Sequence, residues 1–137
     1  ELARFMLALK GGLAGADPVP VLIFAGGDAG GGGAVAAAVG ERLAGLAKAA
    51  QVLVVTHSPQ VAARGDRHIR VAKRTAKGST VTSAEPLDDA ARIEEIARML
   101  AGARITAEAR AAAQSLLEDG RAGRTVAAKP RKTKAGT

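Results

Sequence analysis

Two residues that can carry acid–base or ligand chemistry each follow a short apolar run. His57 comes directly after Gln51–Thr56, and Asp28 comes two glycines after Val19–Ala25. An imidazole can exchange a proton near neutral pH, and a carboxylate can accept hydrogen bonds or bind a metal ion. Taken alone, however, His57 is typical of an ordinary loop histidine. Asp28 alone is typical of a turn residue that tolerates left-handed backbone geometry.

Glycines surround Asp28, at positions 26, 27 and 30–33. Such a cluster suggests a loop that cradles phosphate, because backbone N–H groups at a helix start can bind anions. The P-loop pattern G-x-x-x-x-G-K-[ST] is nevertheless absent from the chain, and no lysine lies near these glycines. The sequence also shows no Ser, His and acid triad and no metal-ligand spacing. We therefore expect neither a P-loop nor a metal site.

Basic residues are concentrated near the C-terminal end. Residues 120–137 hold 6 of the 20 basic residues and none of the 13 acidic residues, which leaves 14 basic against 13 acidic residues elsewhere. A tail of this kind can bind nucleic acid by neutralising phosphates, but a solvated, disordered end has the same composition. The residues that would contact DNA are Arg121, Arg124, Lys129, Arg131, Lys132 and Lys134.

The composition indicates one small domain with an aliphatic core. Of the 137 residues 47% are hydrophobic, yet only Phe5 and Phe24 are aromatic. An alanine-rich core buries little apolar area per residue, so we expect marginal stability without a partner surface. The absence of cysteine fits a reducing compartment, and no apolar run is long enough to span a membrane. We expect a soluble cytoplasmic protein, and because the chain opens with Glu1 we expect its start to be missing.

Hydrophobic periodicity predicts an α/β fold. Two continuous apolar runs, 19–25 and 51–56, are typical of parallel strands buried on both faces. The helical pattern between them implies a crossover connection. Strands at 68–74 and 79–82 are expected to pair as an antiparallel hairpin through Lys77 and Gly78. Helices are expected over 2–14, 34–49, 90–101 and 106–117, the third capped by Asp88 or Asp89 and the last by Thr106. Gly120 is expected to close a domain over 1–119, followed by a basic disordered tail over 120–137.

Four segments in order resemble the RecN family, a branch of the SMC and ABC-type ATPases. The segments are ELARFMLALK, VLIFAGGDAGGGG, VLVVTHSPQVAARGD and VTSAEPLDDAARIEEIARMLAG. The likeness covers residues 1–119. Several motifs in the same order and spacing are more specific than any one of them. The resemblance implies the C-terminal lobe of an ABC/SMC-type P-loop ATPase head, in which parallel strands, a hairpin and flanking helices follow a signature helix.

The resemblance assigns roles to individual residues. Asp28 matches the D-loop aspartate and His57 the switch histidine, while Glu1 begins the signature helix. In this family Asp28, Gly30 and Glu1 would lie near ATP across a pair of heads, and His57 would lie near the γ-phosphate. ATP and Mg²⁺ are the family's cofactors, and phosphoryl transfer there depends on positioning and on charge stabilisation. The function implied is ATP-dependent recombinational repair of DNA double-strand breaks, at the bacterial nucleoid.

The chain departs from the family pattern where the chemistry is most demanding. The Walker B strand should end in Asp-Glu, but these positions hold Ala25 and Gly26. Neither residue can bind Mg²⁺ or orient water. Loss of one transition-state-stabilising group commonly lowers a rate by about 10² to 10³. We therefore expect the chain alone to hydrolyse no ATP and to bind neither ATP nor Mg²⁺.

Three hypotheses follow for the way the chain works. As a head lobe, it would need an N-terminal head portion bearing the P-loop, a second head as a homodimer partner, and DNA. As a non-catalytic module, it would dock to another head through a sheet edge and the helix that starts at Leu2. As a small DNA-binding protein, it would act through its basic tail.

Overall fold

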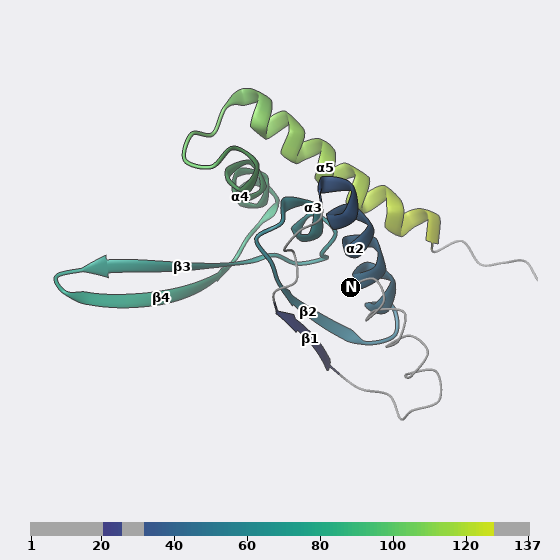
Figure 1. Cartoon of the computed structure of the whole chain (residues 1–137), viewed down its shortest axis with the longest axis horizontal. Helices are drawn as coiled ribbons and strands as arrows, with labels where there is room; N and C mark the ends of the chain where they lie inside the picture. Colours follow the sequence, from purple (N-terminus) through teal and green to yellow (C-terminus); the bar gives the residue numbers. More distant parts are fainter. Residues whose placement is uncertain (1–20, 26–31, 128–137) are drawn as a thin grey trace, which may run out of the picture.

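The computed structural model describes residues 21–25 and 32–127, and this part of the chain is α/β, as expected (Figure 1). The helix expected over 2–14 lies outside the described residues. None of the described helices is both long and apolar enough to cross a membrane. The elements, in chain order, are β1 (Val21–Ala25), α2 (Gly33–Leu46), β2 (Gln51–Val55), α3 (Pro59–Ala62), β3 (Ile69–Ala76), β4 (Ser79–Pro86), α4 (Asp89–Ala101) and α5 (Ala107–Ala127).

Strands β1 and β2 form a parallel two-stranded sheet, which confirms the predicted pairing. Phe24 lies opposite Val54 in the register, and the helix α2 connects the two strands. One face of this sheet packs on a small core built around the buried side chains of Leu43 in α2 and Val61 in α3. Phe24 and Val52 supply the strand side of that core. The apolar spacing along α2 therefore places the helix on the sheet, as expected of an amphipathic helix.

The other face of the sheet is exposed in the described part of the molecule. Ile23 is 70% exposed and Val55 is 65% exposed, and Leu53 between them is also exposed. The prediction of strands buried on both faces is therefore wrong for these residues. Side chains alternate across a strand, and the described helices cover only the face that carries Phe24. An apolar run alone does not reveal what covers its second face.

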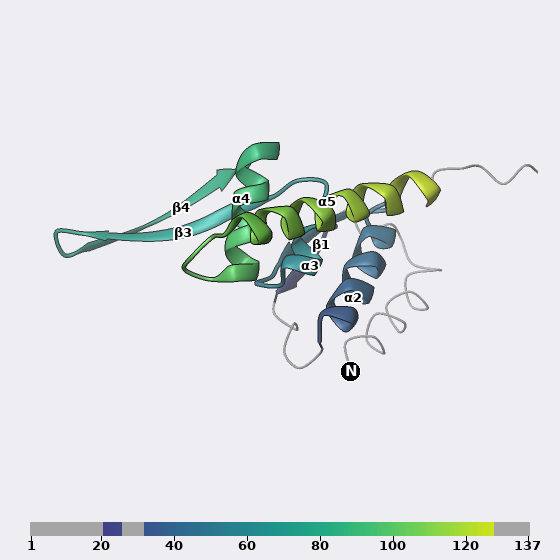
Figure 2. The same ribbon diagram turned by 90° about the horizontal axis from the view of Figure 1, so that it is seen from above.

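The strands β3 and β4 form the predicted antiparallel hairpin, but they are longer than expected. The register pairs Ile69 with Pro86 at the base and Ala76 with Ser79 at the tip. Lys77 and Gly78 both have positive φ angles, 49° and 77°. This geometry suits a two-residue turn that matches the twist of the strands. The hairpin extends away from the helices in both views (Figures 1 and 2).

Helices α4 and α5 pack on each other and on α3 around a second core, whose central side chain, Ile96, is 0% exposed. Asp88 caps α4 by accepting a hydrogen bond from the N–H of Ala91 at 2.8 Å, and Thr106 accepts one from Ala109 at 3.2 Å near the start of α5. Both caps were expected from the sequence. Four of the six buried members of this core are alanine, in agreement with the composition. The buried members are Ala63, Ile96, Ala97, Ala109, Ala113 and Leu117.

Helix α5 does not end before Gly120 but continues to Ala127. The prediction that a disordered tail begins at residue 120 is therefore wrong for 120–127. Gly120 is buried against α3, and a Cβ at this position would lie 2.5 Å from the carbonyl oxygen of Ala63. The glycine thus allows two backbones to approach closely and does not end the helix. Figures 1 and 2 both show α5 lying along α3 toward α2.

Candidate functional site at one edge of the parallel sheet

Both strands of the parallel sheet end at the same edge. Ala25, the last residue of β1, lies opposite Val55, the last residue of β2. His57 follows two residues after Val55, and its side chain is exposed. Since neighbouring parallel strands present their carboxyl ends together, the ends of β1 and β2 lie at one rim (Figure 1), and His57 follows closely after the end of β2. The predicted juxtaposition of these two strand ends is confirmed.

The loop that carries His57 is held by hydrogen bonds on both sides of the histidine. The N–H of Ser58 donates to Oγ1 of Thr56 at 2.9 Å. The buried hydroxyl of Ser58 accepts from the N–H of Val61 at 3.4 Å and thereby caps α3. The same hydroxyl lies 3.0 Å from Oε1 of Gln60, to which it donates. The backbone on either side of the imidazole is thus defined by local contacts, as positioned functional loops require.

Arg92 in α4 holds the other end of α3. Its Nη2 atom donates to three backbone carbonyls, those of Ala62 at 3.1 Å, Ala63 at 3.4 Å and Gly65 at 2.5 Å. The side chain is 6% exposed. The last carbonyls of a helix lack partners within the helix, and a buried guanidinium satisfies them while it anchors α3 to α4. Arg92 therefore positions the segment that follows His57.

Arg92 and Glu95 were not among the residues predicted from the sequence. Both lie on the buried side of α4, next to Ile96 and Ala97, and each is 6% exposed. The signal that could have found them is the placement of two charged residues within the apolar stripe of α4, where charged side chains are rare unless they are paired.

A group of charged side chains lies where the hairpin meets α4. Arg98 donates to Glu95 through Nε at 2.9 Å and through Nη2 at 2.6 Å. These hydrogen bonds hold the pKa of Glu95 below its ordinary value, and the positive charge of Arg70 acts in the same direction. Burial lowers the pKa of His68, and the charge of Arg92 lowers it further, whereas Glu95 opposes the shift.

The rim offers an imidazole but no carboxylate among the described residues. Ala25 stands at the strand end where a Walker B aspartate would be expected, and it has no side-chain oxygen. Among residues 21–25 and 32–127, no three His, Cys, Asp or Glu side chains gather where they could hold a metal ion. An imidazole without such groups can donate or accept one hydrogen bond but cannot bind Mg²⁺–phosphate alone. The other predicted site residues, Glu1, Gly26, Asp28 and Gly30, lie outside the described residues.

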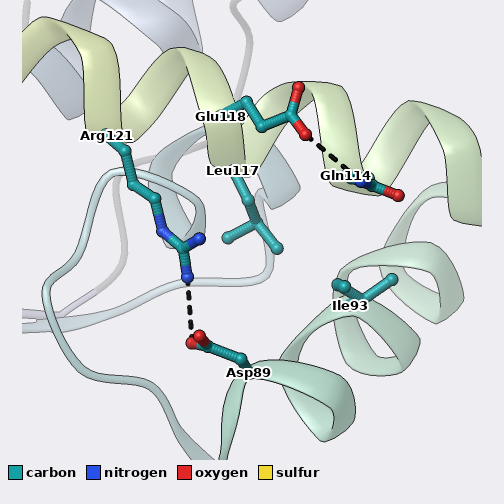
Figure 3. Close-up of a pocket in the computed structure, with 6 residues that line it drawn as sticks. All are labelled: Asp89, Ile93, Gln114, Leu117, Glu118 and Arg121. Carbon is teal, nitrogen blue, oxygen red and sulfur yellow. Dashed lines mark hydrogen bonds and ion pairs between the residues drawn. The ribbon is translucent and has the colours of Figure 1, made fainter.

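Of the six basic residues assigned to DNA binding, only Arg121 has a side chain that the structure describes. Arg121 forms an ion pair with Asp89 at 2.9 Å across a shallow pocket between α4 and α5 (Figure 3). In the same pocket Gln114 donates to Glu118 at 3.2 Å. The Arg121–Asp89 pair therefore joins α4 and α5, whereas the hydrogen bond between Gln114 and Glu118 lies within α5. Arg124 lies within α5, and the other four residues, Lys129, Arg131, Lys132 and Lys134, lie outside the described residues.

Curated proteins from distant bacteria are similar to this chain. The DNA repair protein RecN of Streptomyces coelicolor is 48% identical over 124 residues, which are 90% of this chain and 22% of the relative. RecN of Xylella fastidiosa (strain Temecula1) is 49% identical over 87% of the chain and 21% of the relative. RecN of Deinococcus radiodurans is 51% identical over 74% of the chain and 18% of the relative. No protein-family model matches the chain.

Identities of this size extend through the described elements and are far above those of chance similarity. They agree with the motif order that suggested the family. The chain spans about a fifth of the length of the relatives it matches. It belongs to the RecN family, as the counterpart of one segment of these proteins.

Proposed function

We propose that the chain is the C-terminal lobe of an ABC/SMC-type ATPase head in a RecN-like protein that acts in recombinational repair of DNA double-strand breaks. The relatives are DNA repair proteins by name. The observation that carries the proposal is the parallel pairing of β1 with β2, which brings His57 to the rim where β1 ends. A head of this kind needs its switch histidine beside its Walker B strand.

The exposed face of the β1–β2 sheet supports a docking role for the lobe. Ile23, Leu53 and Val55 form an apolar surface on a sheet of two strands. Parallel sheets are normally covered on both faces, and burial of apolar side chains of this size contributes about 1.5–3 kcal/mol each. The proposed occupant is the P-loop-bearing N-terminal part of the same head, which would cover this face. A second head would then complete each ATP site.

In the assembled head His57 would contact the γ-phosphate, while Asp28, Gly30 and Glu1 would face ATP across the head pair. ATP and Mg²⁺ would be held by the P-loop part. Because Ala25 and Gly26 replace the Walker B carboxylates, the lobe would not support hydrolysis alone. The same replacements, together with the exposed sheet face, favour a second candidate function, a non-catalytic docking module. In both cases the chain would work at the bacterial nucleoid, in the cytoplasm.

Association with a P-loop-bearing head fragment of a RecN protein tests the proposal. The full chain is expected to co-purify with that fragment, and Ile23→Asp combined with Val55→Asp is expected to abolish co-purification because it places two charges in the apolar contact. Val71→Asp is the matched control, since Val71 is also an exposed valine (67%) but lies on the hairpin. Isothermal titration calorimetry of the three proteins gives the affinities.

Two results would contradict the proposal. Absence of association between the unmodified chain and the fragment would remove the head assignment. Equal affinity of the sheet variant and the Val71 control would show that the β1–β2 face is not the docking surface. Circular dichroism of each variant verifies that the fold is retained, since all three side chains are exposed.

A further inference from the structure

The β3–β4 hairpin is a long ribbon whose outer half is covered by no described element. It has eight cross-strand pairs, from Ile69–Pro86 to Ala76–Ser79. Nearly all of its residues beyond Ala72 are exposed, and it extends away from the helices in both views (Figures 1 and 2). Such a ribbon contributes little to the described core, and two-stranded ribbons are marginally stable by themselves. Its length is therefore better explained by a partner than by packing.

All charged residues in the outer half of the hairpin are cationic. Lys73, Arg74 and Lys77 lie there, and residues 71–84 contain no acid. Within the described part of the chain none of these three side chains forms an ion pair, whereas Arg70 at the base is paired with Glu85 at 2.9 Å. Because side chains alternate along a strand, Lys73 and Arg74 lie on opposite faces, and Lys77 lies at the turn. Positive charge is thus presented on both faces and at the tip.

Hydroxyl groups accompany these cations. Thr82 lies opposite Lys73, and Thr75 lies opposite Thr80 with the two Oγ1 atoms 3.1 Å apart. Lysine, arginine and threonine side chains are the groups that contact phosphate oxygens in protein–DNA complexes. The hairpin contains no Phe, Tyr or Trp, so it lacks the aromatic platform on which single-stranded bases stack.

We infer that the outer half of the β3–β4 hairpin contacts the phosphate backbone of double-stranded DNA, through Lys73, Arg74 and Lys77. The inference rests on the proposed function in DNA repair and names the surface that meets the substrate. A two-stranded ribbon fits the major groove of duplex DNA, which is about 12 Å wide. Contacts of this type would position the protein on DNA without selecting a sequence, because phosphates carry no base information.

Fluorescence anisotropy with a random-sequence duplex of about 30 base pairs tests this inference. The hairpin variant carries Lys73→Gln, Arg74→Gln and Lys77→Gln in the full chain. Its affinity for the duplex is expected to fall roughly tenfold or more at low salt. The dependence of log Kd on log salt is expected to become shallower by about 1 for each lost phosphate contact. A charge-preserving variant, Lys73→Arg with Lys77→Arg, is expected to keep the affinity of the parent.

Two matched variants separate the hairpin from general charge effects. One replaces Arg42, Lys48 and Arg104, which are exposed and lie outside the hairpin, by Gln. The other replaces Lys129, Arg131, Lys132 and Lys134 by Gln. The inference holds if the hairpin variant loses much more affinity than the first. The inference is overturned if the hairpin variant and the variant at Arg42, Lys48 and Arg104 lose equal affinity, or if only the variant at Lys129, Arg131, Lys132 and Lys134 loses affinity. It is also overturned if the unmodified chain binds poly-glutamate as tightly as DNA, which would indicate an acidic protein partner.

Failure of this inference is distinguishable from failure of the proposed function. The hairpin variant retains the apolar face of Ile23 and Val55, so its association with the P-loop-bearing fragment is expected to be unchanged. Normal association with unaltered DNA affinity would reject the hairpin contact alone. Loss of association in the unmodified chain would reject the head assignment, whatever the hairpin does.

Discussion

Gly120 in α5 lies directly against the backbone of Ala63, close enough that a Cβ on the glycine would be 2.5 Å from the Ala63 carbonyl oxygen. Ala63 is the C-cap residue of α3, and α3 begins two residues after His57. On the other side of α3, a Cβ on Gly40 in α2 would lie 3.3 Å from the backbone of Val61. The helix α3, which follows His57, is therefore held between α2 and α5, and each of these two helices contacts it at a glycine.

The substitution Gly120→Ala is expected to destabilise the protein by about 1–3 kcal/mol, because the added methyl group meets a backbone atom that cannot rotate away. Gly45→Ala is the matched control, since nothing lies within 4 Å of a Cβ there. In a helix that change is expected to stabilise by up to about 1 kcal/mol. Urea denaturation measures both values. Similar effects of the two substitutions would contradict the close packing of α5 on α3.

Arg92→Met is expected to destabilise the protein by about 2–4 kcal/mol. The substitution keeps much of the apolar stem but leaves three backbone carbonyls, at residues 62, 63 and 65, without this donor. Arg92→Lys is expected to lose less, because an ammonium group can still donate. The exposed Arg104→Met serves as control, with an expected change within about 0.5 kcal/mol. A Met variant as stable as the parent would show that Arg92 does not hold α3.

Protein stability is expected to decrease as the pH falls below about 6.5, because of His68. Burial lowers the pKa of His68 in the folded protein, so the unfolded chain binds a proton more readily. The stabilisation is thus fully present above the unfolded pKa and is lost as the pH falls toward the folded pKa. Thermal unfolding at about pH 7.5, 6.5 and 5.5 measures the loss, and His68→Gln is expected to flatten the profile over this range.

A second loss of stability is expected at lower pH, from Glu95. Its pKa is lowered by the hydrogen bonds from Arg98, so its contribution is present above the ordinary glutamate value and is lost as the pH falls through the folded pKa. Glu95→Gln is expected to remove this acidic transition while the transition near neutral pH remains. If His68→Gln removed both transitions and Glu95→Gln removed neither, the assignment of the two groups would be wrong.

ATP hydrolysis is expected to be absent from the chain alone and to require both lobes of a head. In a complex with a P-loop-bearing RecN fragment, Ala25→Asp with Gly26→Glu is expected to raise the rate by about 10² or more, because it restores groups for Mg²⁺ and for water. Adding His57→Ala is expected to remove that gain. A coupled phosphate-release assay measures the rates. Hydrolysis by the isolated chain that disappears on His57→Ala would contradict this prediction.

The sequence predicted most of the local structure because local structure depends on near neighbours. Apolar spacing located α2 and α4, and Asp88 and Thr106 marked the starts of α4 and α5 through caps that reach only three residues along the chain. The turn at Lys77 and Gly78 was predicted for the same reason. Two apolar runs joined by a helix predicted the parallel pairing that brings the strand end at Ala25 and His57 to one rim.

Only the tertiary structure decided features that depend on residues far apart in the chain. Gly120 looked like a helix end, but its contact with Ala63, 57 positions earlier, makes it an interior helix residue. No sequence pattern indicated a role for Arg92, which binds carbonyls about 30 residues away. The exposed face at Ile23 and Val55 has the same cause, because an apolar strand signals burial without specifying what buries it. Periodicity records a preference for burial, whereas the neighbouring element is selected by the packing of the whole chain.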